Sequence, residues 1–172
     1  MDDLSLKNHT CCFTGHREIG GISKIKLGVH ISLAIQYCLD KGIYRFLCGG
    51  ARGFDTVAAV YVHHLKATHP EVELHLILPC RDQNKGWSTE DNRRYYAIMG
   101  LADSIHYVHD TYTRSCMKER NAYMVDHSTA CICFYDENQP KTGTGQTVRM
   151  AKSQGLLTLN LYSACTESIE EI

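Results

Sequence analysis

The stretch Phe46-Leu-Cys-Gly-Gly-Ala-Arg-Gly-Phe-Asp55 (FLCGGARGFD) joins an apolar run to a helix-like segment through three glycines. In the segment that follows, Phe54, Ala58, Tyr61 and Leu65 recur at the spacing of one helix face. An apolar strand, a glycine-rich turn and a helix in this order are typical of a sheet whose strands are connected by helices.

The same alternation runs through the whole sequence. Short apolar runs predict six strands, at residues 10–14, 44–48, 72–78, 104–108, 130–135 and 156–161. Helical periodicity between them predicts five helices, around residues 27–38, 54–65, 89–101, 115–128 and 145–154. This order predicts an α/β, Rossmann-like, doubly wound fold with a mainly parallel six-stranded sheet and helices on both faces. Because no linker or repeat interrupts it, we expect one domain over residues 1–172, with its core at 10–161.

The composition argues against several classes of protein. Hydrophobic residues make up 44% and charged residues 22% of the chain, which is typical of a globular protein. The formal net charge of −1 gives no general attraction to polyanions, so nucleic acid is not expected as a partner. The N-terminus lacks the features of a signal peptide, and no apolar run approaches the roughly 20 residues that span a bilayer. We therefore expect a cytoplasmic protein with no membrane partner.

The nine cysteines and ten histidines do not indicate a metal or redox site. The cysteine count is odd, the sequence contains no Cys-x-x-Cys pair, and five cysteines lie in apolar, strand-like runs. A free cysteine in such a run behaves as a small hydrophobe. The histidines are scattered, and the adjacent His63 and His64 face different ways on their helix. We expect reduced, structural cysteines, no metal and no cofactor.

The unusual residues gather in the segments that follow the strands. In a parallel sheet these segments share one edge, and ligands bind there, where the strand order reverses. The segments after the first five strands are Thr14–Arg17, Cys48–Asp55, Leu78–Asp82, His109–Arg114 and Asp136–Thr147.

Within FLCGGARGFD, the glycines allow backbone N–H groups to approach an anion closely, and the next helix points its N-terminus at the same place. Arg52 can supply paired hydrogen bonds to a phosphate. Asp55 would repel a phosphate, so it either caps the helix or binds a ribose hydroxyl. The alternative for the whole stretch is a glycine turn with an Asp cap. The glycines follow the second strand, unlike those of redox-cofactor proteins, and no Gly-Lys-Ser/Thr loop is present.

Three further segments offer candidate residues, each with an ordinary alternative. In the glycine-rich stretch at 142–147, Thr144 or Thr147 either caps the next helix or binds phosphate. His16 is an acid, base or donor, or a simple loop residue, and Arg17 beside it is a phosphate ligand or solvated. Near a helix start, Arg120 and Asn121 reach a base or ribose, or are a surface arginine and a buried polar side chain. The single tryptophan either stacks on a base or covers a core edge.

In combination, FTGHR (13–17), GGARGFD (49–55), RNAYMVDHS (120–128) and TGTGQT (142–147) resemble the YpsA-like family of the SLOG superfamily. This superfamily includes the DNA-processing DprA proteins and the LOG phosphoribohydrolases. The resemblance implies a Rossmann-like fold, a nucleotide or nucleotide-derived ligand such as an ADP-ribose-like molecule, and self-association as a homodimer or higher homo-oligomer. The ligand-binding residues that we expect are Thr14, Gly15, His16, Arg17, Gly49, Gly50, Ala51, Arg52, Gly53, Asp55, Arg120, Asn121, Gly143, Thr144, Gly145 and Thr147.

One departure from the LOG enzymes bears on catalysis. Met150 stands about where those enzymes carry a glutamate that helps to cleave the N-glycosidic bond, and methionine cannot activate water. Asp55, Asp126 and Asp136 are candidate substitutes whose spacing does not place them together. Our first hypothesis is therefore a nucleotide-binding sensor, regulator or sequestering module. The alternative is a nucleotide N-glycosidic-bond hydrolase.

Overall fold

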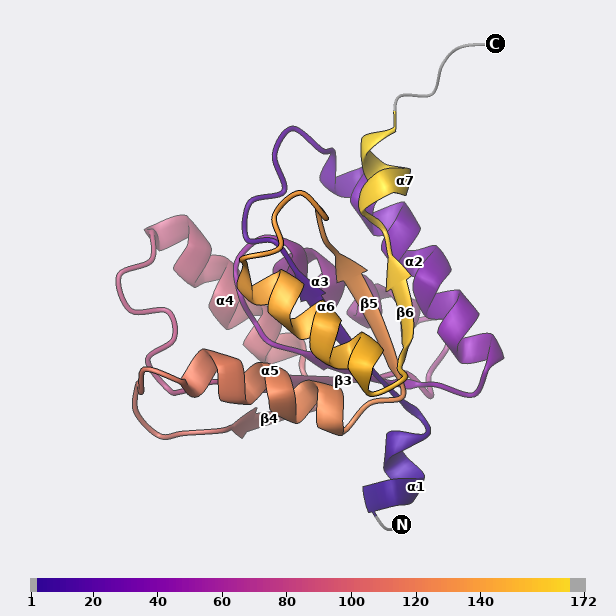
Figure 1. The fold of residues 1–172 in the computed structure, drawn as a ribbon, viewed down its shortest axis with the longest axis horizontal. Helices are drawn as coiled ribbons and strands as arrows, with labels where there is room; N and C mark the ends of the chain where they lie inside the picture. Colours follow the sequence, from indigo (N-terminus) through magenta and orange to yellow (C-terminus); the bar gives the residue numbers. More distant parts are fainter. Residues whose placement is uncertain (1–2, 168–172) are drawn as a thin grey trace.

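Strands and helices alternate along residues 3–167, which are the part of the chain that the computed structural model describes (Figure 1). The strands are β1 (Thr10–Gly15), β2 (Arg45–Cys48), β3 (Glu73–Leu78), β4 (Ser104–Tyr107), β5 (Ala130–Phe134) and β6 (Leu157–Asn160). The helices are α1 (Asp3–Lys7), α2 (Lys24–Asp40), α3 (Phe54–Leu65), α4 (Thr89–Leu101), α5 (Cys116–Asp126), α6 (Gly143–Ser153) and α7 (Tyr162–Thr166).

The six strands form one parallel sheet in the order β4-β3-β2-β1-β5-β6. The chain builds outward from β1 to β4, then crosses back and adds β5 and β6 on the other side of β1. At the centre, Cys12 of β1 pairs with Leu47 of β2 and with Cys131 of β5. The strand order therefore reverses between β1 and β5, which is the position where doubly wound folds bind ligands.

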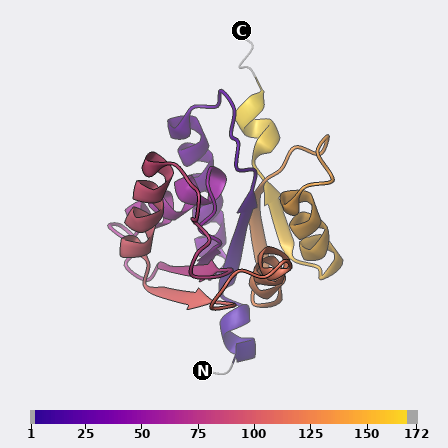
Figure 2. The ribbon, with the colours of Figure 1, turned by 90° about the vertical axis from the view of Figure 1, so that its left-hand side faces the viewer.

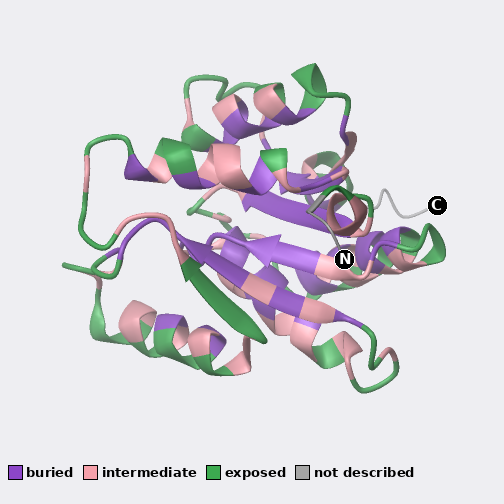
Figure 3. Ribbon diagram, turned by 90° about the horizontal axis from the view of Figure 1, so that it is seen from below, coloured by how far each residue is buried: buried purple, intermediate pink, exposed green. Residues whose placement is uncertain are grey.

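Helices cover both faces of the sheet, as Figure 2 shows. Helices α2, α3 and α4 pack side by side on one face, and α5 and α6 pack together on the other. Adjacent residues of a strand point to opposite faces, so Phe13 joins the core under α2 and α3 whereas Cys12 joins the core under α5 and α6. The central strands are buried, while the edge strand β4 is exposed (Figure 3).

Local signals set most of the helix boundaries. Ser23 and Ser88 are the N-caps of α2 and α4, where each hydroxyl accepts a hydrogen bond from a first-turn N–H group. Gly42 and Gly155, just beyond α2 and α6, have φ angles of +77° and +75°, which only glycine adopts without strain. All nine cysteines are buried, free thiols. Among the described helices, none is long and apolar enough to cross a membrane.

The predicted fold class is confirmed: the sheet has six parallel strands, and helices cover both faces. Two short helices were not predicted, α1 before the first strand and α7 after the last. Each has five residues, which is too short to show helical periodicity. The predicted start of α6 is corrected, because Thr142 is its N-cap, with Oγ1 3.0 Å from the Gly145 nitrogen. Thr147 instead donates its hydroxyl to the Gly143 carbonyl (2.8 Å).

A substitution at the end of β1 tests how tightly the layers pack. A Cβ atom on Gly15 would lie 2.4–2.5 Å from Phe54, whose side chain is fully buried and has no room to move. We expect Gly15→Ala to lower the free energy of unfolding by about 1–3 kcal/mol. Gly100→Ala, in α4 with nothing within 4 Å of the added atom, is the control and should be neutral or stabilising by up to about 1 kcal/mol. Urea denaturation measures both; equal stability of the two variants would contradict this packing.

Candidate functional site

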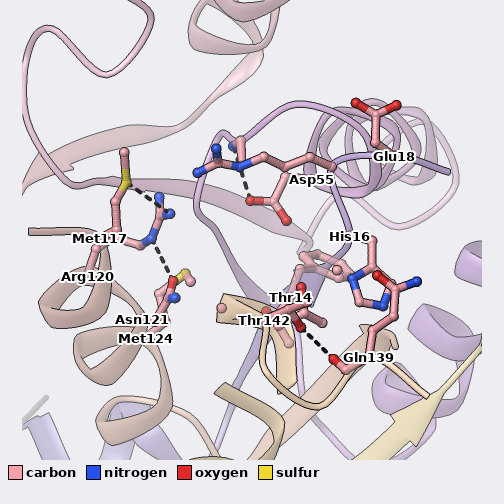
Figure 4. A pocket seen from close by; sticks show the side chains of 16 residues that line it. Thr14, His16, Glu18, Asp55, Met117, Arg120, Asn121, Met124, Gln139 and Thr142 are labelled. Atoms are coloured by element: carbon pink, nitrogen blue, oxygen red, sulfur yellow. Dashed lines mark hydrogen bonds between the residues drawn. The ribbon is translucent and has the colours of Figure 1, made fainter. Parts of the chain in front are cut away.

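A pocket of about 350 Å³ opens at the edge of the sheet where the strand order reverses. Its walls come from the end of β1, from the segments after β1, β2 and β5, from one face of α5 and from the first turn of α6 (Figure 4). The lining residues are Phe13, Thr14, Gly15, His16, Arg17, Glu18, Ala51, Asp55, Met117, Arg120, Asn121, Met124, Gln139, Thr142, Gly143 and Thr144.

Arg120 is the central buried side chain of this pocket, with only 4% of its surface exposed. It projects from α5 and donates hydrogen bonds to two backbone carbonyls, those of Gly49, which follows β2, and of Ile77 in β3 (3.4 Å). Its Nε donates to the Asn121 side-chain oxygen (2.8 Å), which orients the guanidinium. Arg120 therefore connects α5, on one face of the sheet, to β2 and β3. These strands lead to α3 and α4 on the other face.

Asp55 lies on the other side of Gly49 and is also buried, with 5% exposed. Its carboxylate accepts a hydrogen bond from the Ala51 N–H at 3.1 Å. A Cβ atom on Gly49 would lie 2.7 Å from the Arg120 Nη1 and 3.0 Å from the Asp55 Oδ2. Gly49 thus leaves room for the side chains of Arg120 and Asp55. The Gly49 carbonyl already accepts a hydrogen bond from Arg120, and the Ala51 N–H already donates one to Asp55.

Burial shifts the pKa of both groups. Burial raises the pKa of Asp55 to about 6, although the positive charge of Arg120 and the Ala51 N–H oppose the rise. Burial also lowers the pKa of Arg120, and the negative charge of Asp55 opposes that change. The carboxyl of Asp55 therefore gains or loses its proton near pH 6. Asp55 also lines the pocket.

His16 fixes the segment after β1. Its Nε2 accepts a hydrogen bond from the Asp136 N–H at 2.8 Å, so the ring is neutral with its proton on Nδ1. Burial lowers the pKa of His16, which keeps the ring in this form, although the charge of Asp136 opposes the shift. The backbone of His16 also bonds to Phe134 and Phe54 (both 3.2 Å). These bonds connect β1 to β5 and to the start of α3.

The positive end of α6 borders the pocket. Gly143 and Thr144 form its first turn and line the pocket, and within the described residues their N–H groups have no hydrogen-bond partner. Arg17 lines the same pocket, and its guanidinium makes no hydrogen bond or ion pair with any residue of the described range. Unpaired N–H groups and an unpaired guanidinium that line one pocket favour an anion.

The structure brings together most, but not all, of the predicted site residues. Ten line the pocket: Thr14, Gly15, His16, Arg17, Ala51, Asp55, Arg120, Asn121, Gly143 and Thr144. Arg52 and Gly53 line a neighbouring pocket instead. Gly49, Gly50, Gly145 and Thr147 do not line the main pocket. Gly145 packs beneath the Pro140 carbonyl, where a Cβ atom would approach to 2.5 Å.

Sequence reasoning missed six lining residues, namely Phe13, Glu18, Met117, Met124, Gln139 and Thr142. Thr142 carried a usable signal, because a threonine directly before a glycine-rich helix start is a common N-cap. Met117 and Met124 lie on α5 at the spacing that places them on the face of Arg120, so a helical projection of this segment would have grouped them. Glu18 and Gln139 carry no distinguishing pattern.

The fold and this pocket define a Rossmann-like α/β protein with a polar pocket at its topological switch point. The sequence model of YpsA, described as the YspA SLOG family, matches residues 13–161, and the chain belongs to this family.

Two curated relatives illustrate the similarity. The uncharacterized SPbeta prophage-derived protein YoqJ of Bacillus subtilis is 34% identical over 121 residues, covering 63% of this chain and 70% of YoqJ. The UPF0398 protein YpsA of the same species is 26% identical over 122 residues, covering 68% of each chain. The alignments span 70% of the first matched relative but only 55% of another, the UPF0398 protein of Halalkalibacterium halodurans.

Among solved structures, the fold is similar to that of DNA processing protein A from Helicobacter pylori, described for its single-stranded DNA binding mode. The TM-score is 0.60 at 18% identity, covering 96% of this chain and 68% of the other. This finding corrects our expectation about nucleic acid: the prediction that nucleic acid is not a partner was wrong, because a protein of this fold binds single-stranded DNA. Net charge averages over the whole surface, whereas binding of a polyanion depends on local clusters.

The buried carboxyl makes stability depend on pH in a defined direction. Asp55 holds its proton more tightly when folded than when unfolded, so its stabilising contribution is present below about pH 4 and is lost as pH rises through about 6. Relative to Asp55→Asn, the wild type should lose about 3 kcal/mol of unfolding free energy between about pH 4 and pH 7.

Urea denaturation at several pH values measures this difference. Asp110→Asn, whose side chain is 86% exposed, controls for the loss of one negative charge. Parallel pH profiles for the wild type and Asp55→Asn would contradict the assignment.

Proposed function

We propose that this protein binds a nucleotide or nucleotide-derived ligand, of the nucleoside phosphate or ADP-ribose-like kind, in the pocket beside β1 and β5. In this proposal it acts in the cytoplasm as a sensor, regulator or sequestering module. The observation that carries the proposal is that one pocket is lined by Arg17, which has no partner among the described residues, and by Gly143 and Thr144, whose first-turn N–H groups in α6 are unpaired within the same residues. An anionic phosphoryl group satisfies both at once.

The rest of the lining supports a ligand with a less polar part. Met117 and Met124 present thioether surface from α5, which suits the face of a base or sugar. The side chains of Asn121 and Gln139 lie on different walls, as Figure 4 shows, and supply amide groups for a base edge or hydroxyl. Family membership fits this proposal, since the YpsA family belongs to the SLOG group.

Isothermal titration calorimetry with ADP-ribose, cyclic ADP-ribose, NAD and nucleoside monophosphates tests the proposal. We expect at least one of these to bind, and Arg17→Gln to weaken its binding about 10- to 100-fold through the loss of a charge-assisted hydrogen bond. Because Arg17 has no partner among the described residues, this variant should keep the stability of the wild type. Lys152→Gln, in the last turn of α6 and away from the pocket, is the charge control. Failure of every ligand to bind, or full affinity in Arg17→Gln, would refute the proposal.

The protonation of Asp55 favours a second candidate, the hydrolysis of a nucleotide N-glycosidic bond. A carboxyl with a pKa of about 6 on a pocket wall is suited to donate a proton to a departing base while water attacks the sugar carbon. Of the three candidate acids, Asp55 lines the pocket, whereas Asp126 and Asp136 do not. Asp126 instead accepts a hydrogen bond from Gln154 at 2.8 Å.

Chromatographic detection of free base separates the two candidates. If the second holds, base release from the bound nucleotide should slow above about pH 6 and fall at least about 100-fold in Asp55→Asn. Asp126→Asn, with its side chain outside the pocket, is the matched control. If the nucleotide stays intact after long incubation, the hydrolysis candidate is rejected and the binding proposal is retained.

A further inference from the structure

A second pocket of about 290 Å³ adjoins the first and shares Arg17 and Glu18 with it. Its walls come from the segment between β1 and α2 and from the first turns of α3 and α4. Four cationic side chains line it, against two carboxylates: Arg17, Lys24, Arg52 and Arg94 face Glu18 and Asp91. We refer to this second pocket, with these six charged residues in its lining, as the basic pocket. Glu90, next to this lining, is paired with Arg94 at 3.0 Å, so the local excess of positive charge is carried mainly by Arg17, Lys24 and Arg52.

The ion pairs within the basic pocket are incomplete. Asp91 accepts from Arg94 at 3.4 Å, so its carboxylate is already engaged. The nearest guanidinium nitrogen of Arg52 is 3.9 Å from Asp91, which is too long for a hydrogen bond. The Nε of Arg52 is buried and has no hydrogen-bond partner within the described residues. The Arg52 side chain is therefore not fully hydrogen-bonded within the described residues, and the part of it that is exposed is available to an anion in the pocket.

Arg52 is also held in place before any ligand arrives. Its guanidinium lies over the ring of Trp87, 5.5 Å from the centroid, and its side chain is 38% exposed. Trp87 packs in turn against Tyr95, which is buried. This cation–π contact restrains the position of the guanidinium while leaving part of it exposed, which favours hydrogen bonding to a phosphate.

The first turn of α3 adds to the same preference. Its N-cap is Gly53, which offers no side-chain cap; the Phe54 N–H donates to the His16 carbonyl, and Thr56 of the same turn lines the basic pocket. Gly53 is held against the preceding segment, since a Cβ atom there would lie 2.1 Å from the Arg17 carbonyl. The loop that carries Arg17 therefore rests directly on the start of α3, and the Arg17 side chain stands between the two pockets.

We propose that the basic pocket binds a second phosphoryl group of the ligand whose first part occupies the main pocket. The inference rests on the proposed function and names its ligand class: a nucleotide that carries two phosphoryl groups. Arg17 contacts both groups, and Arg52, Lys24 and Arg94 contact the second. The two groups are joined either directly, as in a nucleoside diphosphate or its esters, or across the ribose, as in a nucleoside 3′,5′-bisphosphate.

Calorimetry at low ionic strength, where charge pairing is least screened, compares AMP, ADP and adenosine 3′,5′-bisphosphate on the full chain. For the wild type, at least one ligand with two phosphoryl groups should bind about 10-fold or more tightly than AMP. In Arg52→Gln this ratio of affinities should fall to near one. Comparison of ADP with the bisphosphate identifies how the two groups are joined. Because Arg52 packs on Trp87, its substitution could also affect folding. Lys24 is exposed and makes no such contact among the described residues, so Lys24→Gln is the second variant, and its ratio of affinities should also fall.

The outcomes separate this inference from the proposed function. If AMP binds and the other ligands bind no more tightly, the basic pocket is not a phosphoryl site, while the proposed function stands. If the gain in affinity persists in both Arg52→Gln and Lys24→Gln, the inference is likewise overturned. If none of the three ligands binds to the wild type, the proposed function fails for nucleoside phosphates, and this inference fails with it.

Discussion

The buried guanidinium of Arg120 is the group on which the arrangement of the site depends. It crosses from α5 to the carbonyls that end β2 and β3, and Asp55 balances its charge on the far side of Gly49. Burial opposes both charges: it raises the pKa of Asp55 and lowers the pKa of Arg120, and the attraction between the two groups only partly offsets these shifts. The hydrogen bonds of Arg120 hold α5, on one face of the sheet, in a fixed position relative to β2 and β3, which lead to α3 and α4 on the other face.

This constraint changes the meaning of the glycine-rich stretch FLCGGARGFD. Each glycine is required for a different structural reason. Gly49 leaves room for the side chains of Arg120 and Asp55. Gly50 adopts a φ angle of +66°, and Gly53 lies against the Arg17 carbonyl. Asp55 occupies the Ala51 N–H that an open phosphate loop would present. The stretch is thus an internal scaffold, and the groups left unpaired at the main pocket lie on its neighbours, Arg17 and the first turn of α6.

The fold could be predicted from the sequence because its signals are local. Apolar runs mark the strands, and Ser23, Ser88 and Gly155 mark helix ends within a few residues of the periodic segments they bound. The site could be predicted only in part, because the role of a side chain there depends on which loops meet. Arg52 and Arg120 are both plausible phosphate ligands in sequence, yet α5 buries one against carbonyls whereas Trp87 holds the other at a second pocket. Nothing local to either residue distinguishes them.

A nearly neutral chain can still present strong local charge, and the strand order explains how. At the switch point, segments from β1, β2 and β5 converge, so helix N-termini and arginines that are far apart in sequence face a common space. The carboxyl of Asp55 is buried beside Gly49 and Arg120, and within the described residues Arg17 has no carboxylate in ion-pair contact. The fold therefore leaves cations without a close ion-pair partner at the pockets, although Glu18 also lines both of them. Local charge of this kind is what a net charge near zero conceals, and it is the physical basis of the phosphoryl-binding pockets that we propose.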